Sequence, residues 1–257
     1  MINKINASHR ARPLLLGGAS LVAGVFAWWA IAHFSGVPAY ILPTPGAVAR
    51  RAVELFGANA LQIHIAQTIA EVIQGGVLGT AIGIVLAMTF ARVHWIRRLL
   101  MPLIVVAQVT PKISIAPLIV LWLGLGIGSK ITLVVLVVFY PVLINMLSRL
   151  SSLPSTLKDL AAITGMGPVR RALKIELPFA LPALAAGLKL GLLQGVTAAV
   201  IGEFIGAQAG LGYLEKQAQD NADIRLVIIA ILLLSLLGYV LYATVTFIEN
   251  RIDKRFE

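Results

Sequence analysis

Residues 162–178 have the sequence AITGMGPVRRALKIELP, a short basic segment between two long apolar stretches. Glycine and proline interrupt helices, so Gly165, Gly167 and Pro168 predict short helical turns here instead of a further membrane span. The dipeptide Leu177-Pro178 leads directly into the next apolar stretch. We therefore expect a compact helical hairpin outside the membrane, within a loop of about residues 148–178, that is joined rigidly to the helix after it.

The composition predicts an integral membrane protein. Of the 257 residues, 59% are hydrophobic and 12% are charged, whereas about a quarter of the residues of a soluble domain are charged. We expect one transmembrane domain over residues 1–257. The formal net charge of +10 is scattered between the apolar stretches and forms no basic patch, so we expect no nucleic-acid partner. The absence of cysteine excludes disulfides and thiolate metal sites.

Six apolar stretches approach the length that crosses a bilayer, which predicts an all-α protein with six transmembrane helices. They run over residues 14–34, 65–90, 99–123, 131–147, 179–201 and 226–247. Six spans place both termini on one side, and that side carries fourteen Lys and Arg residues against five on the other. The positive-inside rule then predicts cytosolic termini. The first stretch is too long for a signal peptide, and no small-residue cleavage site follows it.

Two outer connections have their own character. Thr44-Pro45 predicts a helix N-cap followed by proline at the first helical position, and hence a short helix on the outer surface. The segment Gly206–Asp223 is mostly polar. It could line the mouth of a transport path or meet an external partner.

Glycine recurs every fourth residue in the second and fifth spans. The two rows are Gly75, Gly79, Gly83 and Gly187, Gly191, Gly195. Small residues at this spacing let helices approach closely in lipid. We favour packing within one subunit over a dimer interface.

The third span contains Pro102, Pro111 and Pro117, which predicts a helix that is broken near the middle proline. Lys112 lies beside this break. A lysine inside a membrane is costly, so Lys112 should face either a transport path or an ion-pair partner. Glu71 in the second span is the candidate acid for Lys112 or for Lys189, and the sequence does not choose between them.

No catalytic or metal site can be assembled from the sequence, so we expect neither an enzyme nor a cofactor. The run Gly124–Lys130 resembles a phosphate-binding loop but lacks the Gly-Lys-Ser/Thr order, and it fits a tight outer turn better. The four histidines are far apart, with no acids at ligand spacing. Energy for uphill transport must then come from a partner protein or from an ion gradient.

Residues 159–178, DLAAITGMGPVRRALKIELP, resemble the cytoplasmic signature of ATP-binding-cassette importer permeases. That signature is Glu-Ala-Ala, three residues, Gly, nine residues, Ile, one residue and Leu-Pro. Asp replaces its Glu here, and Leu160 replaces its first Ala. The resemblance implies cytosolic coupling helices between spans four and five that dock on an ATPase. The implied coupling residues are Asp159, Ala161, Ala162, Gly165, Ile175, Leu177 and Pro178.

The resemblance covers most of the chain. The segments ILPTPGAV, APLIVLWLGLGIGSK, FYPVLIN, LPALAAGLK and GEFIGAQAGLGY are similar to the branch that imports nitrate, taurine, alkanesulfonates, bicarbonate or pyrimidine precursors. PKISIAPL and GEF slightly favour the pyrimidine-like members. The family usually has arginine where Glu71 and Lys189 stand here, so anion specificity does not carry over to this chain.

The resemblance implies a type I importer permease in a bacterial inner membrane that transports a small solute. Its partners would be ATP-binding-cassette ATPase subunits, which hydrolyse the ATP, an extracytoplasmic substrate-binding protein and a second permease copy, forming a homodimer in the bilayer. We expect the translocation path to use polar residues of the spans. They are Gln108, Thr110, Lys112, Ser114, Asn145, Lys189, Thr197 and Glu203.

Two alternatives belong to other classes of protein. A secondary transporter or channel would suit a broken helix and intramembrane charges, but it gives no reason for a structured cytosolic loop. A membrane-anchored scaffold predicts no transport at all. Uptake by the chain alone under an ion gradient would identify the first alternative.

Overall fold

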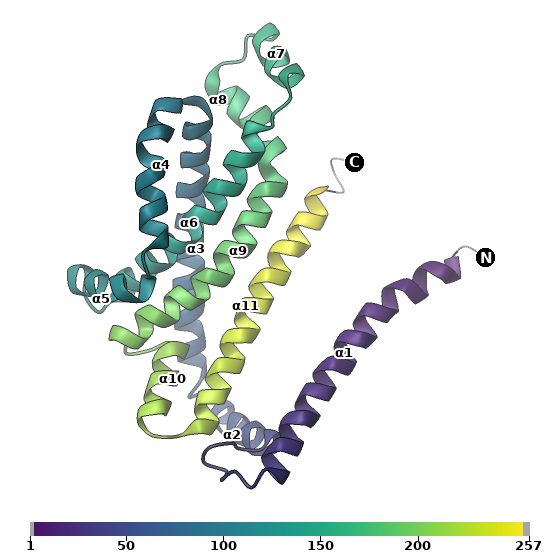
Figure 1. Ribbon diagram of the computed structural model, residues 1–257, viewed down its shortest axis with the longest axis vertical. Helices are drawn as coiled ribbons and strands as arrows, with labels where there is room; N and C mark the ends of the chain where they lie inside the picture. The colour runs from purple at the N-terminus through teal and green to yellow at the C-terminus, as the bar shows by residue number, and fades with distance from the viewer. Residues whose placement is uncertain (1–2, 254–257) are drawn as a thin grey trace. The chain divides into compact units, whose positions relative to one another are not determined.

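Figure 1 shows the computed structural model, which describes the backbone of residues 3–253 and the side chains of residues 18–251. Within this described part, the long regular elements are all α-helices, confirming the all-α prediction. The chain divides into two compact units. The first is Met1–Leu61 with Glu215–Ile229, and the second is Gln62–Leu214 with Ala230–Glu257.

The first unit contains α1 (Asn3–Phe34) and α2 (Pro45–Gly57). The predicted N-cap is confirmed, because the Thr44 hydroxyl accepts a hydrogen bond from the Ala47 amide at 3.4 Å and Pro45 is the first helical residue. Val48 on α2 is buried. The Trp28 indole N–H donates to the Pro43 carbonyl at 3.1 Å, which fixes the loop between the two helices.

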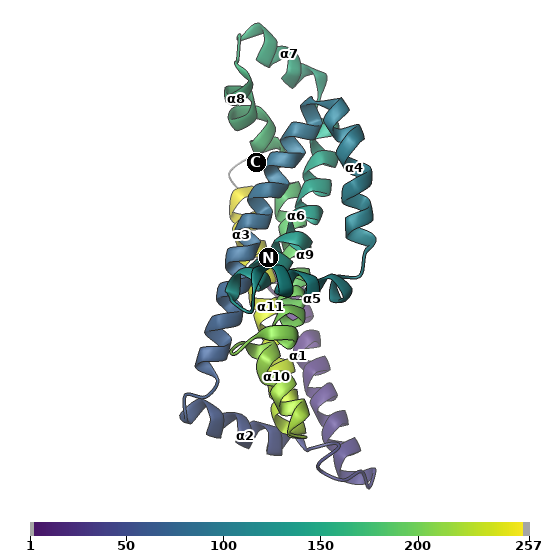
Figure 2. The same ribbon diagram turned by 90° about the vertical axis from the view of Figure 1, so that its left-hand side faces the viewer.

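The second unit is built on α3 (Gln62–Arg92), α6 (Ile127–Ser151) and α9 (Leu177–Gly206). Both views show these three helices side by side (Figures 1 and 2). The remaining elements are α4 (His94–Val109), α5 (Lys112–Leu123), α7 (Ser155–Ile163), α8 (Pro168–Arg171), a π-helical turn (Ala172–Glu176), α10 (Leu211–Asp220) and α11 (Ile224–Asp253).

Both glycine rows face α6, which confirms that they serve packing inside the subunit. A Cβ atom added to Gly79 would lie 2.9 Å from the Cβ of Val138. One added to Gly187 would lie 2.7 Å from the Pro141 carbonyl oxygen. Both rows meet the same residues of α6, Val134, Val138 and Val142, and the α3 and α9 backbones approach them too closely for any larger residue.

Four helical segments in the described residues are long and apolar enough to cross a membrane: Gln62–Arg92, Ile127–Ser151, Pro168–Gly206 and Ile224–Arg251. The pair α4 and α5 gives a fifth candidate. The apolar part of α1, Gly18–Phe34, is a shorter apolar helix, at the lower limit of length for a span. The six predicted stretches thus correspond to four spans, one bent pair and this shorter helix.

The third predicted span is two helices, bent by 101° between α4 and α5. The break lies at Thr110-Pro111, where the sequence predicted it. Pro111 has no N–H to continue the helix, and Lys112 begins α5. The predicted interruption of the third span at the middle proline is therefore confirmed.

Candidate functional site

The segment between α6 and α9 folds as a tightly closed hairpin. The Gly165 amide donates to the Ala162 carbonyl at 3.1 Å and the Met166 amide donates to the Ala161 carbonyl at 3.0 Å. These two bonds and the positive φ of +60° at Gly165 form a Schellman cap, which closes the end of α7. Gly167 then caps α8, and Pro168 takes its first position.

A small apolar core fixes this hairpin to the membrane helices. Leu153, Ala161 and Ile175 are buried together, and Met166 and Phe179 pack against them. The π-helical turn Ala172–Glu176 runs without interruption into α9. The end of the hairpin and the start of α9 are therefore one continuous helical stretch.

A buried carboxylate strengthens the same junction. The Glu176 side chain accepts a hydrogen bond from the Arg92 guanidinium at 2.6 Å, and it forms an ion pair with the Arg171 guanidinium at 2.9 Å. Arg92 also donates to the Pro168 carbonyl at 3.1 Å. Since Arg92 ends α3, whereas Arg171 ends α8 within the hairpin, these contacts join the hairpin to one membrane helix, α3.

The outer surface of the hairpin is apolar and basic. Ile163 is 85% exposed, and Lys158, Arg170 and Lys174 of the hairpin are also exposed. Further large apolar side chains that are exposed on this surface, the hairpin face, are Leu160, Val169 and Leu173. α7 and α8 project at one end of the second unit (Figures 1 and 2). Exposed apolar patches of this kind mark protein interaction sites.

The predicted coupling residues lie in different parts of the hairpin and at the start of α9. Ala161 and Ile175 are in its core. Gly165 makes its turn. Leu177 and Pro178 are the half-buried first residues of α9. Asp159 and Ala162 are exposed on α7.

The opposite end of the second unit contains a network of buried polar groups. Glu203, near the end of α9, accepts a hydrogen bond from the Thr68 hydroxyl at 2.6 Å and another from the Gly212 amide at 2.5 Å. The Leu211 amide donates to the Thr68 hydroxyl at 2.8 Å, and the Gly210 amide to His64 Nδ1 at 3.1 Å. This network ties the segment after α9 to α3.

Glycine is required in this segment for steric reasons. A Cβ atom on Gly212 would lie 2.7 Å from a Glu203 carboxylate oxygen and 3.0 Å from the Val200 Cα atom. Gly210 has a φ of +126°, in the region that favours glycine, and a Cβ there would overlap the same carboxylate. The pattern GEFIGAQAGLGY thus encodes a buried carboxylate and the glycines that approach it.

Lys130 belongs to the same end and is also buried. Its ammonium donates to the carbonyls of Leu125 at 2.5 Å, Gly126 at 3.2 Å and Gly206 at 2.5 Å. Gly206 ends α9, so Lys130 satisfies one of the carbonyls that a helix terminus leaves unpaired. The sequence analysis placed Lys130 in an outer turn; this was wrong, because α6 already begins at Ile127.

Glu71 pairs with neither of the lysines that the sequence proposed. Lys112 donates to the Gln108 carbonyl instead. Lys189 forms its ion pair with Glu249 of α11. Glu71 is buried on α3, where its Oε1 atom accepts from the Gln67 amide at 2.9 Å. No group of three His, Asp or Glu side chains that could hold a metal ion is found in the described residues.

Half of the predicted path residues surround the break between α4 and α5. The Thr110 hydroxyl donates to the Val106 carbonyl at 2.9 Å, and the Gln108 amide donates to the Leu136 carbonyl of α6 at 2.9 Å. Lys112 and Ser114 lie in the first turn of α5. The Lys112 ammonium donates to the Gln108 carbonyl beside the break, as an interruption inside a membrane requires.

The other path residues lie elsewhere. Asn145 donates to the Pro141 carbonyl within α6 at 2.8 Å. Lys189 joins α9 to α11, Thr197 is exposed on α9, and Glu203 belongs to the buried network. Their role in a path stays a prediction.

Thr68, Lys130 and Glu176 are structural anchors that the sequence patterns did not predict. Each makes its decisive contact with a residue that is 76 to 143 positions away in the chain. Glu176 did have a local signal, because it stands between Ile175 and Leu177 of the signature. Thr68 and Lys130 had none.

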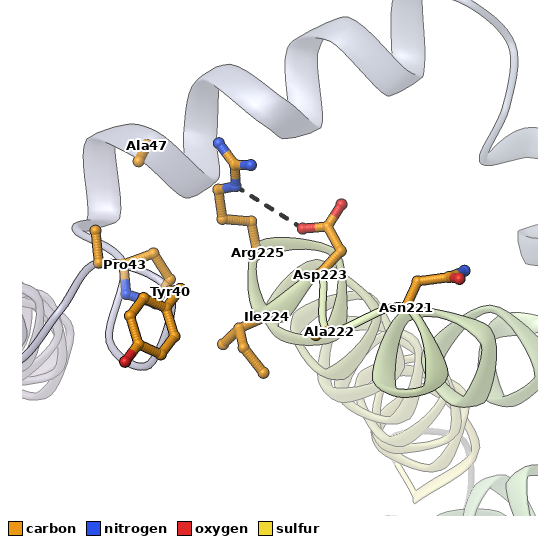
Figure 3. Close-up of a pocket in the computed structure, with 9 residues that line it drawn as sticks. Tyr40, Pro43, Ala47, Asn221, Ala222, Asp223, Ile224 and Arg225 are labelled. Carbon is orange, nitrogen blue, oxygen red and sulfur yellow. Dashed lines mark ion pairs between the residues drawn. The ribbon is translucent and has the colours of Figure 1, made fainter.

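The first unit holds a separate pocket of about 450 Å³. Figure 3 shows Tyr40, Pro43 and Ala47 on one side of it and the turn Asn221–Arg225 on the other. Asp223 lies 3.8 Å from Arg225 and 3.6 Å from Arg51 of α2. The end of the polar segment predicted from the sequence, Gly206–Asp223, thus lines a pocket.

Curated proteins similar to this chain are named as transport permeases. A probable ABC transporter permease of Haemophilus influenzae is 35% identical over 93% of this chain and 96% of its own length. The riboflavin transport permease RibX of Chloroflexus aurantiacus is 35% identical over 87% of this chain and 83% of its own. The formylaminopyrimidine transport permease ThiX of Halalkalibacterium halodurans is 32% identical, with 87% and 88% covered.

A solved structure shows the same fold. A chain of the inward-facing MetNI methionine ABC transporter superposes with a TM-score of 0.60, covering 76% of this chain and 95% of that chain at 20% identity. Residues 79–254 match the family described as binding-protein-dependent transport system inner membrane component. The chain has the type I permease-like fold, and it belongs to this family of ABC transporter permeases.

Proposed function

We propose that this chain forms the translocation path of an ATP-driven, binding-protein-dependent importer for a small solute. Two copies would enclose the path in the inner membrane, with both termini in the cytosol. ATPase subunits would dock on the hairpin face, and a substrate-binding protein would approach from outside. ATP-driven closure below would move the two permeases between inward-open and outward-open states.

The hairpin between α6 and α9 is the observation that carries this proposal. It is closed by a Schellman cap at Gly165, fixed by the Ala161 and Ile175 core and joined to α3 through Glu176 and Arg92. A hairpin so constrained moves as one body with α9. Its exposed apolar face gives a partner protein a surface to push against.

The first unit supports the proposed docking of a substrate-binding protein from outside. The pocket between Tyr40 and the turn Asn221–Arg225 contains both an acid and a base, and such mixed polar surfaces suit transient docking. A binding protein that contacts this turn would deliver its solute beside it. The lysine and arginine distribution supports placing the hairpin face in the cytosol.

Two relatives support a heterocyclic solute among those that the sequence left open. The relatives named for riboflavin and formylaminopyrimidine are 35% and 32% identical to this chain. Both solutes contain a pyrimidine ring. We propose a pyrimidine-like solute over a sulfonate, taurine, nitrate or bicarbonate.

A charge on the hairpin face tests the ATPase partnership. Ile163→Asp places a carboxylate on that face, where Ile163 is 85% exposed. We expect at least a tenfold loss of ATPase co-purification and of ATP-driven uptake, since a charge buried at an interface is strongly unfavourable. The melting temperature of the purified chain should stay unchanged, because the side chain is exposed.

Val53→Asp is the matched control. Val53 is 73% exposed on α2, far along the chain from the hairpin, and this variant should retain the ATPase subunits. Retention of the ATPase by Ile163→Asp would contradict the docking role. Uptake by the chain alone in liposomes under an ion gradient would instead identify a secondary transporter.

A further inference from the structure

One face of α4 is basic at its start and apolar further along the helix. The residues of this face follow the i, i+3, i+4, i+7 spacing of a single helical stripe, and they line a groove of about 660 Å³. They are His94, Arg97, Arg98, Met101, Pro102 and Val105. The α4 groove formed by these residues therefore has a cationic end and an apolar body, as a binding site for an amphiphile requires.

A second cavity, of about 320 Å³, shares His94 and Arg97 with the cationic end of the α4 groove. It is lined by the end of α3, the start of α4, the end of α6 and residues of the hairpin. Its charged side chains are Arg92, Arg97, Lys158, Arg171 and Glu176. Because four of these five are cations, the cavity attracts anions.

The cations around this cavity are not all balanced by protein groups. The Glu176 carboxylate is already paired with two of the arginines. Within residues 18–251, the side chains of Arg97, Arg98 and Lys158 make no ion pair or hydrogen bond. Arg97 is half-buried, and a charge that is partly removed from water is costly unless an opposite charge pairs with it. Three cations thus remain available for an anionic group.

The surface of α4 changes along the helix in the way that a phospholipid does. Trp95 is exposed at the basic end, and tryptophan is enriched at the boundary between the bilayer and water. Further along, Leu99, Leu103 and Val106 are exposed, and α4 with α5 forms a candidate membrane span. The basic end is therefore expected at the level of lipid phosphates, and the apolar body at the level of acyl chains.

We propose that the α4 groove and the adjoining cavity bind an anionic phospholipid. Its phosphate meets Arg97 and the unpaired cations on either side, Arg98 in the groove and Lys158 in the cavity. One acyl chain lies along Met101 and Val105. Basic pockets at the membrane surface bind anionic headgroups. A zwitterionic phospholipid is disfavoured, because its ammonium group adds another cation to the cluster.

This lipid site goes beyond the importer function and does not depend on it, since it requires only that α4 enters the bilayer. An occupied site joins α4 to the hairpin, because Arg97 belongs to α4 and Lys158 to α7. A ligand that binds only the folded chain stabilises it. Bound anionic lipid should therefore raise the melting temperature.

Native mass spectrometry of the delipidated, full-length chain in detergent micelles tests the site. The probe is phosphatidylglycerol, and phosphatidylcholine with the same acyl chains is the comparison. We expect saturable binding of phosphatidylglycerol at least about tenfold tighter than that of phosphatidylcholine, and an increase in melting temperature with phosphatidylglycerol alone. Glycerol 3-phosphate, which has the phosphate but no acyl chain, should displace the lipid poorly. Equal displacement by it would identify a phosphate site and overturn the lipid site.

Charge variants locate the bound lipid. Arg97→Gln/Arg98→Gln should weaken phosphatidylglycerol binding about tenfold or more, since each basic residue beside anionic lipid contributes roughly fivefold. Lys158→Gln changes the cavity from the hairpin side and should weaken binding about threefold or more. Arg50→Gln/Lys216→Gln, the matched control, removes two cations that line neither cavity and should bind as the unmodified chain does. An unchanged melting temperature without lipid shows that each variant is folded.

A second copy of this chain is the competing occupant of the α4 groove, and Val105→Cys distinguishes it from a lipid. The chain contains no cysteine, so this thiol is unique, and Val105 is exposed. A membrane-permeant maleimide should label it fully in the delipidated chain, and phosphatidylglycerol should slow the labelling at least fivefold. Shielding of the thiol without added lipid, equal binding of the two lipids, or unchanged binding by both charge variants would each overturn the lipid site.

Discussion

The two ends of the α3, α6 and α9 bundle differ in how deeply their charged side chains and the partners of those side chains are buried. At the hairpin end, Glu176 is buried, but its partners Arg92 and Arg171 are about one-third exposed, and large apolar side chains face outward. At the other end, Glu71, Glu203 and Lys130 are all buried. Their hydrogen-bond partners are mostly backbone groups and a buried threonine.

The two ends of this one set of helices therefore suit different structural requirements. A surface that docks a partner must expose apolar groups and keep its own core small. An end that closes a path, or that recognises a solute, must hold polar groups in fixed positions away from water. The rigid glycine-lined contacts between the helices connect the two ends.

The largest effect in this comparison is expected from Glu203→Ala. The change leaves the Thr68 hydroxyl and the Gly212 amide buried without their acceptor, and it leaves the Lys130 charge with less compensation. We expect a loss of about 3–5 kcal/mol in the free energy of unfolding, measured by denaturant titration of the purified chain in mild detergent.

Asp220→Ala is the control for this variant. It also removes an acid that pairs with a lysine, Lys216, but Asp220 is exposed, and such pairs contribute less than about 1 kcal/mol. Equal losses in the two variants would show that the buried network contributes no more than a surface pair.

A smaller effect is expected from Glu176→Gln at the hairpin end. The variant removes the charge that holds Arg92 and Arg171, yet both guanidinium groups can turn toward water. We expect a local loss of about 1–3 kcal/mol, seen as roughly 5- to 150-fold faster amide exchange over residues 166–178 by mass spectrometry. High salt should reduce the difference from the unmodified chain.

The control for the local nature of this effect is the exchange of residues 203–214. Those amides belong to the buried network at the other end and should keep their protection in Glu176→Gln. Faster exchange at both ends would show that the two ends are not energetically separate.

The sequence predicted the features that local chemistry decides. Thr44-Pro45 began a helix because a hydroxyl cap and a fixed proline φ act within one turn. Pro111 interrupted a span because a missing N–H acts at its own position. The spacing from Asp159 to Pro178 identified the hairpin, and the glycine rows identified the close helix contacts.

The sequence did not predict which distant groups meet. Glu71 had two lysines of suitable charge in neighbouring spans, and only the rotation of the packed helices excludes both. Lys130 was assigned to an outer turn because it ends the run Gly124–Lys130. Its partner carbonyl at Gly206 is 76 residues away and gave no local signal. Sequence patterns indicate which face of a helix is buried, but not the depth or register at which the helix packs. Which buried polar groups pair with one another could therefore be learned only from the structure.

The smallest effect is expected from Gly165→Ala, which alters the conformation of the hairpin without removing any contact. At a φ of +60°, an alanine costs about 1–2 kcal/mol. The Schellman cap should open more often, and uptake by the complete transporter should fall more than membrane insertion does.

Gly167→Ala is a matched control two residues away, because its φ of −63° suits alanine and nothing lies within 4 Å of the added methyl. Because Gly167 is the N-cap of α8, where alanine is a poorer cap than glycine, that variant should lose less than about 1 kcal/mol. If the two variants behave alike, the left-handed turn is not what couples the hairpin to α9; if only Gly165→Ala impairs uptake while ATP hydrolysis continues, the turn itself transmits the motion.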